Sequence, residues 1–195
     1  SLPGGCAIGS RPINFHLDSL KKMGAKIKIK DGYIFASAQN GLKGCTIKFP
    51  KISVGATENI LIAACFAKGE TKLRNCAVEP EINDLINFLK KLGCKIKQIG
   101  KRSINVLGVA ELKSAVHKVI FDRIETGTYI IAAALTKGRL KIKNINPKLM
   151  STEIRLLQKM GVDIIKKKNY IIASRSKNLK GLNIVTKPYP GFPTD

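Results

Sequence analysis

The 195-residue sequence predicts a mixed α/β (α+β) fold assembled from repeated units of about 70 residues. Three observations support this prediction. Similar helical segments recur at a nearly fixed spacing, and each is followed by short strands in which polar and apolar residues alternate. Hydrophobic residues make up 44% of the chain, which is enough to build substantial cores.

Two short sequence elements recur and set the length of the unit. The first places a glycine after an amphipathic stretch, in LKKMGAKI (20–27), LKKLGCKI (89–96) and LQKMGVDI (157–164). The second begins near a Leu-Lys pair and ends on Thr or Asp, at 41–57, 111–128 and 178–195. This recurrence predicts a complete unit at 42–110 and a second at 112–178. Residues 1–40 then match the second half of an earlier unit, and 179–195 match the start of a later one.

The unit at 42–110 shows its elements in order. A helix is predicted over 56–67, with Thr57 marking its start, and a short strand follows Gly69. An amphipathic helix is predicted over 79–93, with Gly93 as its C-cap. Its apolar face is made of Ile82, Leu85, Ile86, Leu89 and Leu92. Two strands around a turn, at 94–100 and 102–108, complete the order strand–helix–strand–helix–strand–strand.

Composition excludes several classes of protein. No apolar run approaches the roughly 20 residues that span a bilayer, so no membrane partner is expected. The five cysteines form no CxxC pair and only two histidines are present, so neither a metal site nor a disulfide framework is predicted. We expect Cys45, Cys65, Cys76 and Cys94 to be small buried side chains in a reducing compartment.

The net charge of +22 has two interpretations. The 28 lysines and 7 arginines are spread along the chain, and aromatic residues are only 6%, too few for a base-stacking surface. A specific nucleic-acid partner is therefore not expected. Nonspecific polyanion binding by a non-catalytic α/β module remains the alternative to an enzyme that uses part of this charge for a small anionic substrate.

Five motifs in order carry a family resemblance: LPGGCAIGSRP, KISVGAT, EPEI, DRIETGT and PGFPTD. From Leu2 to Asp195 the sequence resembles the UDP-N-acetylglucosamine 1-carboxyvinyltransferase family, within the enolpyruvyl transferase (EPSP synthase) superfamily. The resemblance implies a two-domain inside-out α/β barrel, here truncated at both ends. It implies that 1–121 is part of the first domain, with a catalytic lid loop at 1–12, and that 122–195 begins the second.

The resemblance also implies an activity. It is transfer of the enolpyruvyl group from phosphoenolpyruvate to the 3′-hydroxyl of UDP-N-acetylglucosamine, with release of phosphate. This reaction is the first committed step of peptidoglycan synthesis, in the bacterial cytoplasm. No cofactor is implied, and the oligomeric state stays open. The sister enzyme acting on shikimate 3-phosphate is a second candidate. The 195-residue chain alone is expected to be inactive, because family members also use residues outside this segment. It is expected to be only marginally folded, because two units are cut open and their sheets are left unpaired.

Cys6 and Asp195 are the catalytic residues that the resemblance implies. A free thiol titrates near 8.5, so Cys6 can give a proton to the enol carbon at neutral pH. Gly4, Gly5 and Gly9 suit a mobile loop around it. By resemblance, Cys6 is also the target of the epoxide antibiotic fosfomycin. Asp195 matches the aspartate that contacts the sugar hydroxyl and is its proposed general base.

Two further stretches are implied to bind substrate. Arg11 can bind the phosphate or carboxylate of phosphoenolpyruvate in bidentate fashion. The stretch Arg11, Pro12, Ile13, Asn14 and Phe15 corresponds to the segment around the uridine. Asn14 stands where relatives commonly carry aspartate, so it adds a donor and loses a charge.

The stretch that includes Lys51, Ser53, Val54 and Gly55 lies just ahead of a predicted helix. Backbone amides at a helix start favour an anion, and the resemblance assigns this stretch to the diphosphate of the nucleotide. An ordinary helix cap explains the same pattern.

The remaining polar candidates are predicted to organise the structure. His16 either orients the adjacent substrate segment or is a packed, hydrogen-bonded histidine. His117 has no motif support and is expected to be structural or exposed. Thr57 and Thr128 are expected to cap helices at equivalent repeat positions. Organising roles are also expected for a set of motif residues: Glu79, Glu81, Asp122, Arg123 and Glu125.

Overall fold

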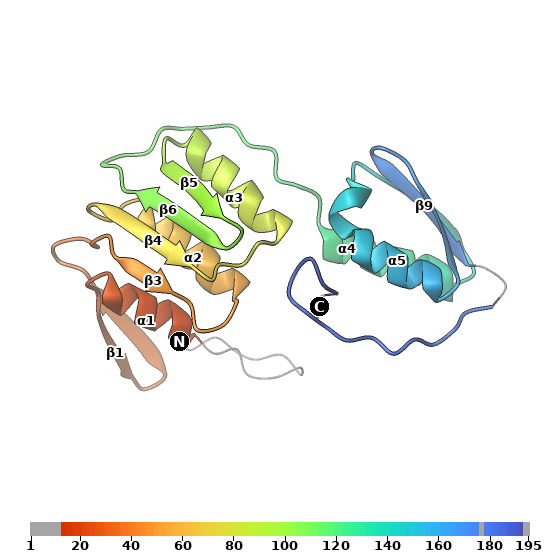
Figure 1. The fold of residues 1–195 in the computed structure, drawn as a ribbon, viewed down its shortest axis with the longest axis horizontal. Coiled ribbons are helices and arrows are strands. Elements are labelled where there is room, and N and C mark those ends of the chain that lie inside the picture. Colours follow the sequence, from red (N-terminus) through yellow and green to blue (C-terminus); the bar gives the residue numbers. More distant parts are fainter. Residues whose placement is uncertain (1–12, 176–177, 193–195) are drawn as a thin grey trace. The chain divides into compact units, whose positions relative to one another are not determined.

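The structure is a computed structural model that describes residues 13–175 and 178–192 (Figure 1). The chain divides into two compact units, one ending at His117 and one beginning at Lys118. The domain boundary expected between 121 and 122 concerns the complete family fold and stays a prediction.

The first unit contains a four-stranded sheet and a separate hairpin. Its elements are α1 (Asn14–Lys22), β1 (Lys26–Lys30), β2 (Tyr33–Ser37), β3 (Thr46–Lys48), α2 (Val54–Ala64), β4 (Glu70–Arg74), α3 (Pro80–Lys91), β5 (Lys95–Gly100) and β6 (Ser103–Leu107). Strands β1 and β2 form the hairpin, and the larger sheet has the order β3-β4-β6-β5. Helices α2 and α3 contact this sheet and each other. The apolar core lies between these layers.

The second unit repeats most of this arrangement. Its elements are α4 (Arg123–Leu135), β7 (Arg139–Lys143), a 3-10 turn η1 (Pro147–Met150), α5 (Ser151–Lys159), β8 (Val162–Lys166) and β9 (Tyr170–Arg175). The sheet order is β7-β9-β8, which matches β4-β6-β5. Strands β6 and β9 occupy the matching position in the two sheets, and each pairs antiparallel with both of its neighbours. The predicted fold class is therefore confirmed, and so is the predicted order of strands and helices in the unit at 42–110.

The amphipathic helix predicted over 79–93 is α3. Ile82, Ile86 and Leu89 are buried, and Leu85 and Leu92 pack against the same core. The prediction of its apolar face is confirmed, because the 3.6-residue period matches the surface that the sheet offers.

The second unit departs from the predicted order at its start. Residues 111–121 contain no strand, whereas β3 at the matching position pairs parallel with β4. The backbone amide of Lys113 donates to the carbonyl of Leu92 at 2.8 Å, at the end of α3. Residues 111–117 therefore lie along the first unit instead of completing the second sheet, and the strand prediction is wrong here.

The recurring glycines end their helices as predicted. Gly24, Gly93 and Gly161 have φ values of +97°, +102° and +95°, a conformation that side chains disfavour. Each follows the C-cap residue of a helix, which is Met23, Leu92 or Met160.

The predicted helix starts at Thr57 and Thr128 are wrong. Helix α2 begins at Val54, and the hydroxyl of Ser53 caps it by accepting from the amide of Ala56 at 3.3 Å. Asp122 caps α4, so Thr128 lies inside that helix. Thr57 is buried and donates to the carbonyl of Ser53.

Three of the four described cysteines are buried as expected. Cys65, Cys76 and Cys94 are fully enclosed, and Cys45 is half-buried. Burial raises the pKa of the thiols of Cys45 and Cys65, and it raises the pKa of Cys76 to about 11. These thiols are therefore poor nucleophiles at neutral pH.

A pair of glycine substitutions tests the packing of the first unit. A Cβ added at Gly108 would overlap the backbone carbonyl of Ala67, whereas one added at Gly127, inside α4, meets nothing within 4 Å. We expect Gly108→Ala to destabilise the complete protein by about 2–3 kcal/mol. Gly127→Ala should stabilise it by about 0.5–1 kcal/mol through backbone entropy. Thermal or denaturant unfolding measures both, and equal effects would contradict the packing described.

Candidate functional site

The predicted uridine segment forms the start of α1. Ile13 occupies the cap position and Asn14 is the first helical residue. Asn14 is exposed, so its amide is available to a ligand, whereas Phe15 packs against the core of the first unit. Of the two side chains, Asn14 is placed for recognition and Phe15 for holding the helix.

The predicted diphosphate segment leads into α2. Lys51 and Gly55 are exposed, Ser53 caps the helix, and Val54 packs against the core. The Ser53 hydroxyl accepts from a backbone amide and keeps its own proton to donate. The helix geometry leaves the amides of Val54 and Gly55 without acceptors inside the helix. The result is a helix start with two amides, a hydroxyl and a lysine.

His16 brings the two segments together. The side-chain amide of Asn59, on α2, donates to His16 Nδ1 at 2.9 Å, which places the ring proton on Nε2. A Cβ at Gly55 would lie 3.5 Å from His16 Cε1, an ordinary van der Waals distance, so the ring lies beside the start of α2. Helices α1 and α2 pack against each other at this point. Sequence patterns gave no signal for Asn59, which is an ordinary polar residue on an apolar helix.

The charge at this junction comes from lysine and the helix rather than from histidine. Burial lowers the pKa of His16, which favours the neutral ring. The N-terminus of α2 carries the positive end of the helix dipole, and Lys51 adds a full charge. This arrangement suits a phosphate-bearing ligand.

An acidic group lies between α2 and α3. Burial raises the pKa of Glu58, and the nearby charges of Glu81 and Glu79 raise it further. Glu79 Oε2 accepts from the amide of Val78 at 2.8 Å, just before α3. The contact of Glu79 fits its predicted organising role, whereas Glu58 was not expected from the sequence.

The start of α4 also organises its surroundings. Asp122 Oδ1 accepts from the amides of Ile124 and Glu125 at 2.8 and 3.0 Å. The Arg123 guanidinium is only 6% exposed and donates to Glu153 Oε1 at 3.1 Å. A buried guanidinium needs such a partner, because an unpaired charge is costly there.

The stretch that leads toward Asp195 is held by α4 and α5. The ring of Tyr189 lies 5.1 Å from the Arg123 guanidinium carbon, and Thr152 donates to the carbonyl of Pro190 at 2.8 Å. Asp195 itself lies outside the described residues, and so do Cys6, Arg11 and Pro12. Their predicted roles therefore stay predictions.

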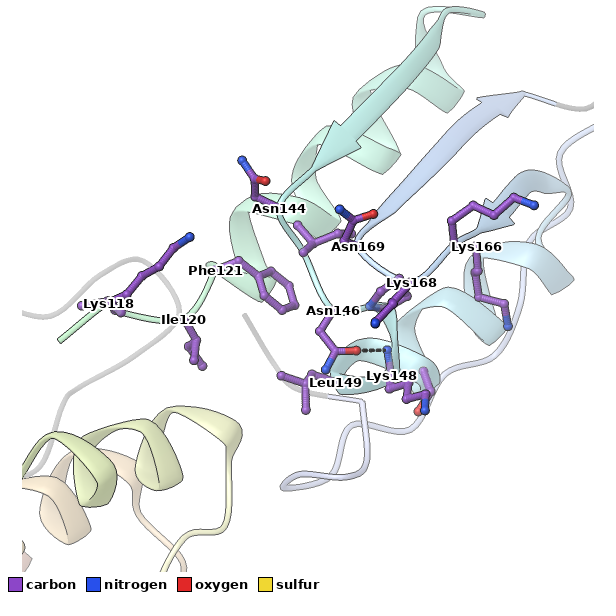
Figure 2. A pocket seen from close by; sticks show the side chains of 15 residues that line it. Lys118, Ile120, Phe121, Asn144, Asn146, Lys148, Leu149, Lys166, Lys168 and Asn169 are labelled. Carbon is purple, nitrogen blue, oxygen red and sulfur yellow. Dashed lines mark hydrogen bonds between the residues drawn. The ribbon is translucent and has the colours of Figure 1, made fainter. Parts of the chain in front are cut away.

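A second concave surface lies within the second unit (Figure 2). This groove of about 1210 Å³ has lysines along its rim and apolar residues at its base. In Figure 2, Phe121 and Leu149 lie between Lys118 on one side and Lys166 on the other. The lining residues that carry charge or amides are Lys118, Asn144, Asn146, Lys148, Lys166, Lys167, Lys168 and Asn169. The sequence did not single out this surface, because its lysines come from three separate segments.

Two searches of the described residues gave no sites. Within 13–175 and 178–192, no three His, Cys, Asp or Glu side chains gather as a metal ion would require. Across the same residues, no helix has the length and apolar character needed to cross a membrane.

Comparison with known proteins identifies the family. The family model for EPSP synthase (3-phosphoshikimate 1-carboxyvinyltransferase) matches residues 1–195. The chain belongs to the EPSP synthase family. The whole-chain resemblance described from the five motifs is thereby confirmed at the level of the family.

Similar curated proteins share one name. The chain is 60% identical over 195 residues to a UDP-N-acetylglucosamine 1-carboxyvinyltransferase from Pelagibacter ubique, covering 100% of this chain and 47% of that protein. It is 53% identical to the enzyme of that name from Endomicrobium trichonymphae, with the same coverage. The chain thus spans about half the length of the curated relatives that it matches.

Solved structures of family members have the same fold. The enolpyruvyl transferase NikO from Streptomyces tendae is 25% identical, with a TM-score of 0.81 over 95% of this chain and 47% of its own. An EPSP synthase from Acinetobacter baumannii is 24% identical, with a TM-score of 0.63 over 92% of this chain and 44% of its own. The latter likeness supports the fold alone.

The half-buried His16 makes a pH-dependent contribution to stability. Because burial lowers its pKa, the folded protein takes up this proton at a lower pH than the unfolded chain does. The contribution is therefore present above the unfolded pKa of about 6.5 and is lost as the pH falls below it. We expect the unfolding midpoint to drop more between about pH 7.5 and 5.5 for the wild type than for His16→Asn. Asparagine keeps an acceptor toward Asn59 but does not titrate, so identical pH profiles would contradict this.

Proposed function

We propose that the complete protein containing this chain is a UDP-N-acetylglucosamine 1-carboxyvinyltransferase. It transfers the enolpyruvyl group from phosphoenolpyruvate to the sugar 3′-hydroxyl and releases phosphate. The observation that carries this proposal is the 60% identity, across all 195 residues, to a protein of that name. The exposed helix start at the junction of α1 and α2 supports the proposal, because its amides, hydroxyl and lysine suit a nucleotide.

The nucleotide occupies the α1–α2 junction in this proposal. Its diphosphate binds the amides of Val54 and Gly55, with the Ser53 hydroxyl and Lys51 supplying further contacts. The exposed amide of Asn14 contacts the uracil edge, where it can both donate and accept. His16 acts indirectly, because its hydrogen bond with Asn59 holds α1 against α2.

The chemistry follows an addition and an elimination. Cys6 gives a proton to C3 of phosphoenolpyruvate, which makes C2 electrophilic, and Asp195 takes the proton of the attacking 3′-hydroxyl. Phosphate then leaves C2 and carries away the proton held by Asp195, while C3 gives a proton back to the Cys6 thiolate, so the double bond forms again. Arg11 holds the phosphate or carboxylate of phosphoenolpyruvate during these steps. The proposal also implies a role in cell-wall synthesis, in a bacterial cytoplasm.

Phosphate release tests the activity and the thiol together. We expect the complete protein to release phosphate from phosphoenolpyruvate when UDP-N-acetylglucosamine is present, and Cys6→Ala to lower kcat at least about 100-fold. Cys45→Ala is the matched control, because this half-buried thiol has a raised pKa and should not affect turnover. Full activity in Cys6→Ala would remove the role of the thiol.

Two parallel measurements separate the alternatives. Shikimate 3-phosphate should not replace the nucleotide sugar as acceptor, and release with it alone would favour the sister enzyme. Fosfomycin should add to Cys6 and to none of the four cysteines with described surroundings, as read by peptide mass spectrometry. Labelling that spares Cys6 would contradict its proposed reactivity.

The lysine-rimmed groove in the second unit favours nonspecific polyanion binding as a second function. Multiple lysines bind nucleic acid through counterion release, so affinity should fall steeply with salt and show no sequence preference. Combined substitution of Lys166, Lys167 and Lys168 by alanine should lower the salt slope by about 2–3 without affecting phosphate release. An unchanged slope would exclude the groove as the binding surface.

A further inference from the structure

The segment that joins the two units is attached to α3 by several contacts. The backbone amide of Lys113 donates to the carbonyl of Leu92 at 2.8 Å. The ammonium of Lys91 donates to the carbonyl of Val116 at 3.2 Å. The bond from Lys113 recurs at Lys43, but there the chain goes on to form β3 and pairs with β4, whereas the chain after Lys113 stays along α3.

His117 makes the last of these contacts. Its Nε2 lies 3.1 Å from Asp84 Oδ1, on α3, with the two side chains only 10% and 14% exposed. The imidazole also packs on the ring of Phe88, with centroids 5.2 Å apart. Its Nδ1 is buried, and no described residue bonds to it. With the proton on Nε2, the ring donates to the carboxylate and leaves no donor unpaired.

The second unit begins only a few residues later. Phe121 packs against the core of that unit, and Asp122 caps α4. Only residues 118–120 lie between the contacts of His117 and those of Phe121. Lys118 and Val119 in this stretch are exposed, Val119 to 71%, whereas Ile120 is half-buried. The chain is therefore held by contacts on both sides of the three-residue stretch 118–120.

We propose that His117 and Asp84 form a clamp that fixes the linker to α3 and confines the hinge between the units to residues 118–120. The pair is partly desolvated, so its hydrogen bond is stronger than a surface contact of the same geometry. Without this pair, only the contacts of Val116 and Lys113 hold the segment to α3, so a longer stretch can move and the units gain freedom of motion. His117 and Asp84 are thus positioning residues, and this role holds whichever substrate the protein uses.

Trypsin cleavage after Lys118 measures this freedom, because a protease needs a locally unfolded segment around the bond. The complete protein is digested briefly, and the peptides are quantified by mass spectrometry. Asp84→Ala should raise the cleavage rate after Lys118 about tenfold, the effect of losing one charge-assisted hydrogen bond. The double variant Asp84→Ala/His117→Asn should be cleaved no faster than either single variant, because both break the same contact.

Matched variants separate the clamp from a loss of packing. His117→Gln can place an amide nitrogen near the Nε2 position and should stay within about twofold of the wild type, whereas the shorter His117→Asn should behave like Asp84→Ala. Asp163→Ala removes an exposed carboxylate from β8 and should change nothing. Cleavage after Lys97, inside β5, reports global unfolding and should also stay constant.

Three results would overturn the proposal. One is an unchanged rate after Lys118 in Asp84→Ala. Another is an equal rise after Lys97, which would mean that the variant merely unfolds. The third is additive behaviour in the double variant, which would mean that the two residues act separately.

Discussion

One backbone hydrogen bond occurs three times and fixes how successive repeats connect. The carbonyls of Met23, Leu92 and Met160, each a helix C-cap, accept from the amides of Lys43, Lys113 and Lys180 at 2.8 Å. Helix C-termini expose carbonyls that need partners, and the left-handed glycine that follows each cap turns the chain away. The Leu-Lys motif of the next element supplies the donor, which explains why the two sequence elements recur together.

The proposed nucleotide site depends on this connection. The bond from Lys43 to Met23 places the segment that becomes β3 and then α2 beside the end of α1. The hydrogen bond between His16 and Asn59 then holds α1 against α2. An exposed amide side chain on α1 and the free amides of α2 thus reach one place, although they are about 40 residues apart in the sequence.

The same bond has a different consequence at Lys113. There the following chain does not enter a sheet but continues along α3, where Lys91, Phe88 and Asp84 hold it. A single repeated interaction therefore serves both to stack elements inside a unit and to lead the chain out of it. The difference lies in the surface of the helix that the chain then follows, because α3 carries Asp84, which pairs with His117.

The sequence by itself determined the repeat, the apolar face of α3 and the family. Glycine positions, helical periodicity and ordered motifs are local signals, and local backbone preference decides them. The caps at Ser53 and Asp122 are local contacts too, although the sequence pattern placed the helix starts at Thr57 and Thr128. Only the tertiary structure decided that residues 111–121 form no strand and that His117 meets Asp84. Both depend on which surface lies opposite the residue. Asp84 lies 33 positions before His117, and no periodic pattern in the sequence relates the two residues. Their contact therefore could not be read from the sequence.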